Sequence, residues 1–358
     1  MGSRRIVLFG WASKVQVHLT RWARGLSERG YEVKVIALGG DPIEGLQTCN
    51  LPRRSKFSYI TQARAAVRQT RDFKPDLVHA HYATGYGFWA NMAGVEPTVI
   101  SVYGSDLIEF PTSFVRRRLL RWIINTATHI TSTSQFLKDI AIEIAPRTKD
   151  RISVIPFGVD LPGLVNPEPA TPPIKVCFIK NHNHRYGPDV LLEAMVRVRQ
   201  TNPRIKLSVA GTGELNEFLK EMSSRLGLND TVAFVGFVPH SQMPLFIEQH
   251  HIMVMPSRNE AFGVAVLETS ACSRPVIASD VGGVSEVLVD GETGILVPKE
   301  DVDRLAEAII RLAEDAALRN RMGASGRVFV QQNYTWEKSL DLMTDLYERL
   351  IHEKGKVK

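Results

Sequence analysis

Two carboxylates separated by seven residues, Glu260 and Glu268, flank a stretch whose pattern could hold a phosphate. An apolar run at 252–256 ends in proline and predicts a buried strand, and a helical pattern begins near Gly263. Unpaired backbone N–H groups at 262–264 would then point from the start of that helix, where anions bind. Carboxylates accept hydrogen bonds from hydroxyl groups, so the pattern is typical of a nucleotide-sugar site. A solvated Glu260 and a helix-surface Glu268 are the alternative.

Short apolar runs alternate with helical patterns along the chain, which predicts parallel sheets covered by helices on both faces. In the first half we expect strands at 6–9, 31–37, 76–80, 98–102, 130–132 and 152–155, with helices at 17–29, 63–71, 115–126 and 135–144. In the second half we expect strands at 174–179, 206–210, 232–235, 252–255, 275–278 and 294–297, with helices at 188–200, 214–226, 241–249, 263–272, 283–289 and 301–313.

A stretch rich in proline and glycine at 156–173 separates the two halves and predicts a linker. The fold class expected is therefore α/β with two Rossmann-like, doubly wound domains, at 1–160 and 161–335. A last helix at 336–354 carries one apolar stripe and could pack on either domain.

Composition narrows the class of protein. The chain of 358 residues is 44% hydrophobic, as in ordinary globular proteins, and no apolar run approaches the ~20 residues that span a bilayer. The N-terminal apolar run is too short for a signal peptide, and the three cysteines have neither disulfide-framework nor zinc spacing. We therefore expect a cytoplasmic protein, which could associate peripherally with the inner face of the membrane.

Glycine-bearing loops follow three expected strands of the second half, at Gly211-Thr-Gly213, Gly263 and Gly282-Gly283. In doubly wound folds ligands bind at the carboxyl ends of the strands. The run from Pro256 to Glu268, together with 275–286 and 290–298, resembles the donor half of the GT-B glycosyltransferases of family 4. Further similarity lies in Gly211-Thr-Gly-Glu, Val235-Gly-Phe-Val-Pro239, Asp76-Leu-Val-His-Ala-His81 and Gly104-Ser-Asp106.

The resemblance implies two domains facing across a cleft, a nucleotide-diphosphate sugar held by the second, and transfer that retains the anomeric configuration without a metal ion or other cofactor. It places Glu260 at the hydroxyls of the donor sugar and Glu268 at the ribose. The diphosphate would be held by the amides of Phe262, Gly263 and Val264. The loop 236–239 would lie by the base. The remaining donor-binding residues are Gly211, Gly236, Phe237 and Val238.

The chain departs from the family pattern at three places. The loop after the first strand, Gly10-Trp-Ala-Ser-Lys-Val15, lacks the family's paired glycines. The family holds the diphosphate with an Arg and a later Lys. Lys180 stands at the position of the Arg, whereas Tyr186 occupies the position of the Lys, and Arg185 beside it would neutralise the diphosphate instead. Solvated loop charges are the alternative for Lys180 and Arg185. The family's His-Gly-x-Asp reads Tyr103-Gly-Ser-Asp106 here. We expect Tyr103 to keep a hydroxyl contact near the sugar and Asp106 to contact sugar or acceptor hydroxyls, a helix cap being the alternative for Asp106.

Two histidines, His79 and His81, alternate at the end of an expected strand. Alternation puts both on one face of the sheet, so either could be a satisfied core group. We favour His81 as a catalytic-site residue. The histidines at 182 and 184 have no local carboxylate or cysteine partner, and we predict no metal site there.

Positive charge is concentrated in the first half, where 22 Lys/Arg against 13 Asp/Glu give +9, whereas 22 against 25 give −3 in residues 161–358. The segment 113–124 combines four arginines with large apolar residues, of which we expect Leu119, Leu120, Ile123 and Ile124 to face the core. A solvated helix face is one interpretation; docking on anionic lipid headgroups is the other. Neither a helix-turn-helix nor an aromatic platform accompanies the charge, so nucleic acid is not an expected partner.

The sequence therefore predicts a retaining glycosyltransferase that moves a sugar from a nucleotide-diphosphate donor to a hydroxyl acceptor, which could be lipid-linked, in glycolipid or surface-polysaccharide assembly. Two alternatives stay open. One is a nucleotide-sugar epimerase of the same architecture, which would consume the donor alone. The other is a non-catalytic subunit that binds a sugar nucleotide, which the altered His and Lys positions favour.

Overall fold

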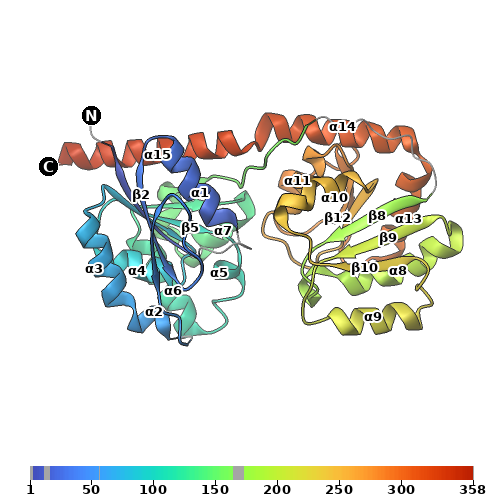
Figure 1. The fold of residues 1–358 in the computed structure, drawn as a ribbon, viewed down its shortest axis with the longest axis horizontal. Coiled ribbons are helices and arrows are strands. Elements are labelled where there is room, and N and C mark those ends of the chain that lie inside the picture. The colour runs from blue at the N-terminus through green and yellow to red at the C-terminus, as the bar shows by residue number, and fades with distance from the viewer. Residues whose placement is uncertain (1–2, 12–16, 56, 164–172, 358) are drawn as a thin grey trace. The chain divides into compact units, whose positions relative to one another are not determined.

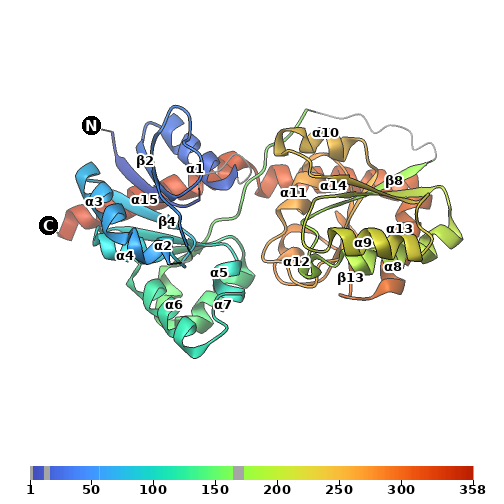
Figure 2. The same ribbon diagram turned by 60° about the horizontal axis from the view of Figure 1, so that its bottom comes forward.

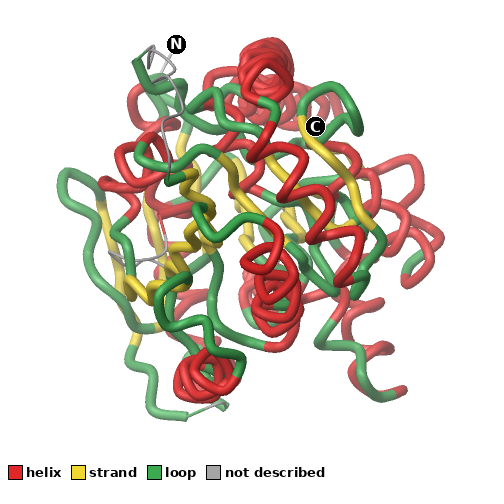
Figure 3. The backbone as a smooth tube through the Cα atoms, turned by 90° about the vertical axis from the view of Figure 1, so that its right-hand side faces the viewer, coloured by secondary structure: helices red, strands yellow, loops and turns green. Residues whose placement is uncertain are grey.

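The computed structural model describes residues 3–11, 17–55, 57–163 and 173–357. The chain forms two compact units, one made by the chain up to Pro156 together with the segment from Glu337 onward, the other by Phe157–Trp336. Part of the expected linker and most of the loop after the first strand lie outside the described residues. In each unit a layer of strands lies between layers of helices (Figures 1 and 3), which confirms the prediction of two doubly wound domains.

Within the described residues of the first unit, seven parallel strands form one sheet in the order β3-β2-β1-β4-β5-β6-β7. Their bounds are β1 (Arg5–Phe9), β2 (Glu32–Leu38), β3 (Gln47–Leu51), β4 (Leu77–His81), β5 (Thr98–Val102), β6 (His129–Ser132) and β7 (Ile152–Val154). The central strands are apolar and buried on both faces, as in a sheet covered on both sides. The carboxyl ends of β4 and β5 bring His81 beside Ser101, because these two residues are register partners.

Helices cover both faces of this sheet: α1 (Val17–Glu28), α2 (Ser58–Thr61), α3 (Ala63–Phe73), α4 (Tyr86–Ala93), α5 (Ser105–Ile108), α6 (Phe114–Thr126), α7 (Gln135–Ile144), the 3-10 helix η1 (Pro146–Arg151) and α15 (Trp336–Val357). The C-terminal helix α15 runs beside α1 (Figure 1). An ion pair of 2.5 Å between Arg29 and Asp341 joins the end of α1 to α15. The last helix thus packs on the first unit.

Helix α6 lies at the surface on the other side of this unit from α15 (Figure 2). The side chain of Ser113 caps its first turn by accepting from the N–H of Arg116. Leu120, Ile123 and Ile124 are buried as expected, but the prediction for Leu119 was wrong, because its side chain is 42% exposed. Successive residues are turned by about 100° in an α-helix, which carries Leu119 off the buried stripe that Leu120 begins.

Six parallel strands of the second unit's described residues form a sheet in the order β10-β9-β8-β11-β12-β13. Their bounds are β8 (Ile174–Ile179), β9 (Ile205–Ala210), β10 (Val232–Gly236), β11 (Ile252–Met255), β12 (Val276–Ser279) and β13 (Gly294–Val297). The helices are η2 (His184–Tyr186), α8 (Pro188–Thr201), α9 (Asn216–Arg225), η3 (His240–Gln242), α10 (Met243–Glu248), α11 (Val264–Ala271), α12 (Val284–Val287), α13 (Val302–Glu314) and α14 (Ala316–Asn333). Asp301 and Asp315 cap α13 and α14 by accepting backbone N–H bonds in the first turn.

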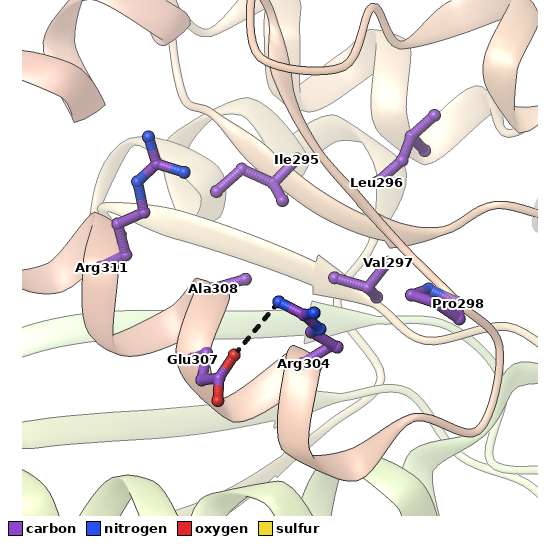
Figure 4. Close-up of a pocket in the computed structure, with 8 residues that line it drawn as sticks. All are labelled: Ile295, Leu296, Val297, Pro298, Arg304, Glu307, Ala308 and Arg311. Carbon is purple, nitrogen blue, oxygen red and sulfur yellow. Dashed lines mark ion pairs between the residues drawn. The ribbon is translucent and has the colours of Figure 1, made fainter.

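A pocket of about 320 Å³ opens between β13 and α13. Figure 4 shows Arg304 and Glu307 of α13 beside the strand, paired at 3.7 Å. None of the residues predicted to act on a ligand lines it. Among the described helices, none combines the length and the apolar character needed to cross a membrane.

Candidate functional site

The loop between β11 and α11 carries the predicted carboxylates. Helix α11 begins after Gly263, whose φ of +100° is left-handed and strains any residue with a side chain. Because glycine has no side chain, it cannot cap the helix, and the first N–H groups of the helix lack intrahelical partners. The ring of Phe262 is buried against Tyr334, with centroids 5.9 Å apart, which anchors this backbone. The helix start thus has the geometry of an anion site.

Lys180 and Glu260 meet in an ion pair between the end of β8 and the loop after β11. The distance from Nζ to Oε2 is 2.6 Å, and the two side chains are 15% and 9% exposed. Lys180 also lies over the ring of Tyr186, 4.9 Å from its centroid. Burial acts to lower the pKa of Lys180, but the charge of Glu260 and the neighbouring Tyr186 outweigh it, so the pKa is raised. The Lys180 ammonium therefore keeps its charge in a largely buried place.

Arg185 belongs to the same arrangement through its backbone and its side chain. Its carbonyl accepts from the N–H groups of Arg258 and Asn259 at 2.8 and 3.4 Å, and its Nε donates to the carbonyl of Asn259 at 3.2 Å. Gly187, directly after η2, could not carry a side chain, because a Cβ there would lie 2.1 Å from the carbonyl oxygen of Pro256. The two loops that hold Lys180 and Glu260 are thus packed backbone to backbone.

Glu268 lies in the second turn of α11 and contacts a residue that the sequence reasoning missed. Its Oε1 is 3.1 Å from Nε2 of His240, in η3, and both side chains are partly exposed. His240 directly follows the motif 235–239, and this position beside an expected donor-binding loop could have identified it from the sequence. The contact brings the loop after β10, where Phe237 is exposed and Val238 is half-buried, next to Glu268.

The glycines after β9 and β10 allow close backbone approach. A Cβ on Gly211, at φ +128°, would lie 2.0 Å from the carbonyl oxygen of Lys180. The N–H of Gly211 donates to the carbonyl of Gly236 at 2.8 Å. The loops that follow β8, β9, β10 and β11 therefore converge at one edge of the sheet, where ligands of doubly wound folds bind.

In the first unit the three predicted residues also lie together; His81 and Asp106 are buried, and Tyr103 is half-buried. Nδ1 of His81 and the hydroxyl of Tyr103 are 2.5 Å apart. The Asp106 carboxylate accepts three backbone N–H bonds of 3.0–3.1 Å, from Ala83, Tyr103 and Gly104. Burial and the nearby His18 lower the pKa of His81 to about 3, and burial raises the pKa of Tyr103 and of Asp106. These side chains stabilise the loops after β4 and β5.

His79 is a satisfied core group, one of the two interpretations that its position allowed. Its Nδ1 is 2.5 Å from the hydroxyl of Tyr347 on α15, and its Nε2 is 2.7 Å from the hydroxyl of Ser101. Its ring stacks on that of His81 at 4.3 Å. Tyr347 lies 268 residues away in the sequence, so no local pattern could have identified it. The buried network joins α15 to the loop that carries Tyr103.

Two family models match the chain: "Glycosyl transferases group 1" over residues 166–329 and "Glycosyl transferase 4-like" over residues 5–134. The GDP-mannose-dependent alpha-(1-6)-phosphatidylinositol monomannoside mannosyltransferase of Mycolicibacterium smegmatis is 30% identical over 267 residues, 69% of each chain. An uncharacterized glycosyltransferase of Methanocaldococcus jannaschii is 27% identical over 309 residues, 84% of each chain.

Solved structures share the fold. Sucrose-phosphate synthase from Thermosynechococcus elongatus superposes with a TM-score of 0.86 at 21% identity, covering 98% of this chain and 100% of that one. HepE of Anabaena in complex with UDP and glucose gives a TM-score of 0.80 at 17% identity, covering 96% of this chain and 99% of that one.

Proposed function

Because this chain belongs to the GT-B glycosyltransferases of the group 1 and 4-like families, we propose that it transfers a sugar from a nucleotide-diphosphate donor to a hydroxyl acceptor with retention of configuration. The observation that carries the proposal is the pair of Lys180 and Glu260 beside the open start of α11. A cation, a carboxylate and unpaired amides suit the phosphate and the hydroxyls of one ligand.

Each group has a role in this proposal. The helix start at Gly263, with Lys180 and Arg185, stabilises the negative charge that develops on the leaving diphosphate. Glu260 accepts from donor-sugar hydroxyls and Glu268 from the ribose. The chemistry then needs no metal ion, because protein cations supply the positive charge, and the departing phosphate helps to deprotonate the acceptor.

A screen of nucleotide sugars tests the donor. Ligands that bind the folded state raise its melting temperature, so UDP-, GDP- and ADP-sugars are compared by thermal shift. We expect one nucleotide class to stabilise the protein, and Lys180→Met to weaken the shift. A control variant, Lys220→Met, removes a lysine that pairs with Glu217 on the exposed face of α9 and should leave the shift unchanged.

Turnover separates the proposal from its rivals. A transferase releases nucleotide only when a hydroxyl acceptor is present, whereas an epimerase converts the donor alone. Donor binding without turnover across sugar, lipid-linked and polysaccharide acceptors would favour a non-catalytic subunit. The named relative acts on a phosphatidylinositol monomannoside, so a lipid-linked acceptor, as in glycolipid or surface-polysaccharide assembly, is the first class to try.

The surface of α6 supports a peripheral membrane position for this enzyme. The helix carries both exposed apolar side chains and exposed arginines: Phe114, Val115, Leu119 and Trp122, and Arg116, Arg117, Arg118 and Arg121. Anionic headgroups attract each basic residue near the surface with about 1 kcal/mol. Burial of the apolar side chains in the membrane would add the free energy of their leaving water. A solvated helix face would explain the arginines but not the exposed apolar side chains.

Vesicle binding tests this part of the proposal. We expect the protein to sediment with phosphatidylglycerol-containing vesicles and not with pure phosphatidylcholine, and salt to weaken the binding. Replacing Phe114 and Trp122 with Ser should reduce binding at least about tenfold. The matched control replaces Phe218 and Val328, which are exposed on α9 and α14 of the second unit. Equal loss in both variants, or no binding by the original protein, would contradict the docking role of α6.

A further inference from the structure

Arg258 lies two residues before Glu260, and its side chain is only 16% exposed. Its guanidinium donates four hydrogen bonds, each of 2.8 Å. Two go to the carboxylate oxygens of Asp189 at the start of α8, one to Glu300 before α13 and one to the carbonyl of His184 in η2. One side chain thus joins three segments that surround the loop of Glu260.

These contacts are stronger than an ordinary surface ion pair. Exposed pairs contribute little to stability, whereas a bidentate, partly buried Arg–carboxylate pair gains from charge-assisted bonds in fixed geometry. Burial acts to raise the pKa of Asp189, but the hydrogen bonds and the charge of Arg258 hold that pKa below its usual value. Arg258 and Asp189 are therefore both charged, and lysine could not reproduce the fork at this place.

The contacts of Arg258 affect the positions of Lys180 and Glu260 through the backbone. The N–H of Arg258 donates to the carbonyl of Arg185, so the fork and the backbone bond clamp the same two loops. One loop begins at Lys180 and the other contains Glu260, and the ion pair of 2.6 Å spans them. A shift of either loop would separate an ammonium and a carboxylate that are both largely buried.

We propose that Arg258 is a positioning residue, which holds the loop of Lys180 against the loop of Glu260 and so fixes both groups for the donor. Arg258 itself touches neither the donor nor the reacting atoms in this proposal. The inference rests on the proposed donor roles of Lys180 and Glu260. Asp189 is the principal anchor of the fork, and Glu300, which is more exposed, is the lesser one.

The accessibility of Lys180 tests the clamp without any sugar substrate. The full chain is treated with acetic anhydride, and the rate of acetylation of Lys180 is followed by mass spectrometry relative to the exposed Lys175 on β8. We expect Arg258→Gln to raise this ratio at least about fivefold, because the loop opens locally. The matched control is Arg197→Gln, which removes a forked arginine that pairs with Asp303 and Glu307 between α8 and α13.

Kinetics provide the second measurement. In Arg258→Gln we expect kcat to fall on the order of tenfold or more, with a smaller change in the KM for donor, because misplaced catalytic groups cost rate. The effect should shrink in a Glu260→Gln background, since Arg258 acts through Glu260. Arg258→Lys should recover only part of the rate, and Arg197→Gln should keep it.

If Arg258→Gln does not fold, Asp189→Asn carries the same test with a smaller expected effect, and Glu300→Gln should follow with the smallest. An unchanged Lys180 acetylation ratio in a folded variant, or equal effects of Arg258→Gln and Arg197→Gln, would overturn the inference. A wild-type protein that transfers no sugar would contradict the proposed function instead, and the acetylation ratio would still decide the role of Arg258.

Discussion

The two units place similar polar residues in opposite situations. At the edge of the second sheet, Lys180 and Glu260 neutralise each other, and Glu268 contacts a partly exposed histidine. At the edge of the first sheet, the Asp106 carboxylate accepts three backbone N–H bonds, and the two ring nitrogens of His79 are hydrogen-bonded to hydroxyl groups. The second unit thus pairs charged side chains with one another, whereas the first unit uses polar groups to hold its loops.

The difference shows what determines the role of a buried polar group. A carboxylate paired with a flexible lysine can exchange that partner for a ligand hydroxyl, because both keep hydrogen-bond capacity. A carboxylate bonded to backbone amides cannot do so without breaking the loop that it holds. We therefore expect substitutions in the second unit to affect activity first, and substitutions in the first unit to affect stability first.

The largest expected effect is that of Glu260→Gln on transfer. Glutamine keeps the shape but loses the charge that strengthens bonds to sugar hydroxyls, so kcat/KM should fall on the order of 100-fold. The variant also leaves Lys180 charged, largely buried and without its carboxylate, which should cost up to about 3 kcal/mol of unfolding free energy. Initial rates and urea unfolding measure the two quantities.

A double variant separates these two losses. Lys180→Met with Glu260→Gln removes both charges, so stability should return while transfer stays low. If transfer returned with stability, Glu260 would be a structural residue, and the contrast between the units would fail.

The second prediction concerns Asp106. In Asp106→Asn the amide NH₂ meets a backbone N–H in place of an accepting oxygen, so we expect a loss of about 2 kcal/mol in unfolding free energy. Transfer by the folded fraction should stay within about threefold of the original rate. The control Asp76→Asn alters a carboxylate that accepts one backbone bond, from Arg5, and should cost less. A drop of transfer by tenfold or more would support the contact with acceptor hydroxyls that the sequence predicted for Asp106.

How far the sequence predicted the site depends on the distance between its parts in the chain. Glu260 and Glu268 share one strand–loop–helix unit, so spacing alone placed them around a helix start. The partner of Glu260, Lys180, directly follows β8, and one partner of His79, Tyr347, lies on α15; such long-range contacts leave no local periodicity. The sequence did not single out Arg258 for the same reason, because its partners Asp189 and Glu300 lie 69 and 42 residues away.

The fold shows a similar limit at particular elements. The strand β3, Gln47–Leu51, was missed because its sequence is mostly polar and lies at the sheet edge. Helix α14 was missed because it contains Gly323 and Gly326, which lower helix propensity. Both glycines serve packing: a Cβ on Gly323 would lie 2.2 Å from the carbonyl oxygen of Ser273. Helix α4 also has a low amphipathic signal, because both of its sides are largely buried.

The third prediction uses pH. The pKa of His81 is about 3 in the folded protein, below the usual value of about 6.5 in the unfolded chain, so the unfolded state binds the proton first. The contribution of His81 to the unfolding free energy should therefore be fully present above pH 6.5 and be lost as the pH falls below it. At pH 5.5 the loss from His81 is about 1.4 kcal/mol. In His81→Asn, the difference between unfolding free energies at pH 7.5 and 5.5 should be smaller by that amount; an equal difference would mean that His81 is accessible to protons in the folded state.

The smallest expected effect is that of Tyr103→Phe, and it tests the contrast most finely. The variant removes one hydroxyl, which lies 2.5 Å from His81, so we expect a loss of about 1 kcal/mol in unfolding free energy. If the hydroxyl serves only the loop, the KM for acceptor and kcat should stay within about twofold. If Tyr103 contacts the sugar as the sequence predicts, kcat should fall while the loss of stability stays the same. Since His81→Asn keeps a hydrogen-bond acceptor for the hydroxyl, it should retain the rate in either case, and a fall of kcat in Tyr103→Phe alone would place one first-unit side chain at the reacting sugar.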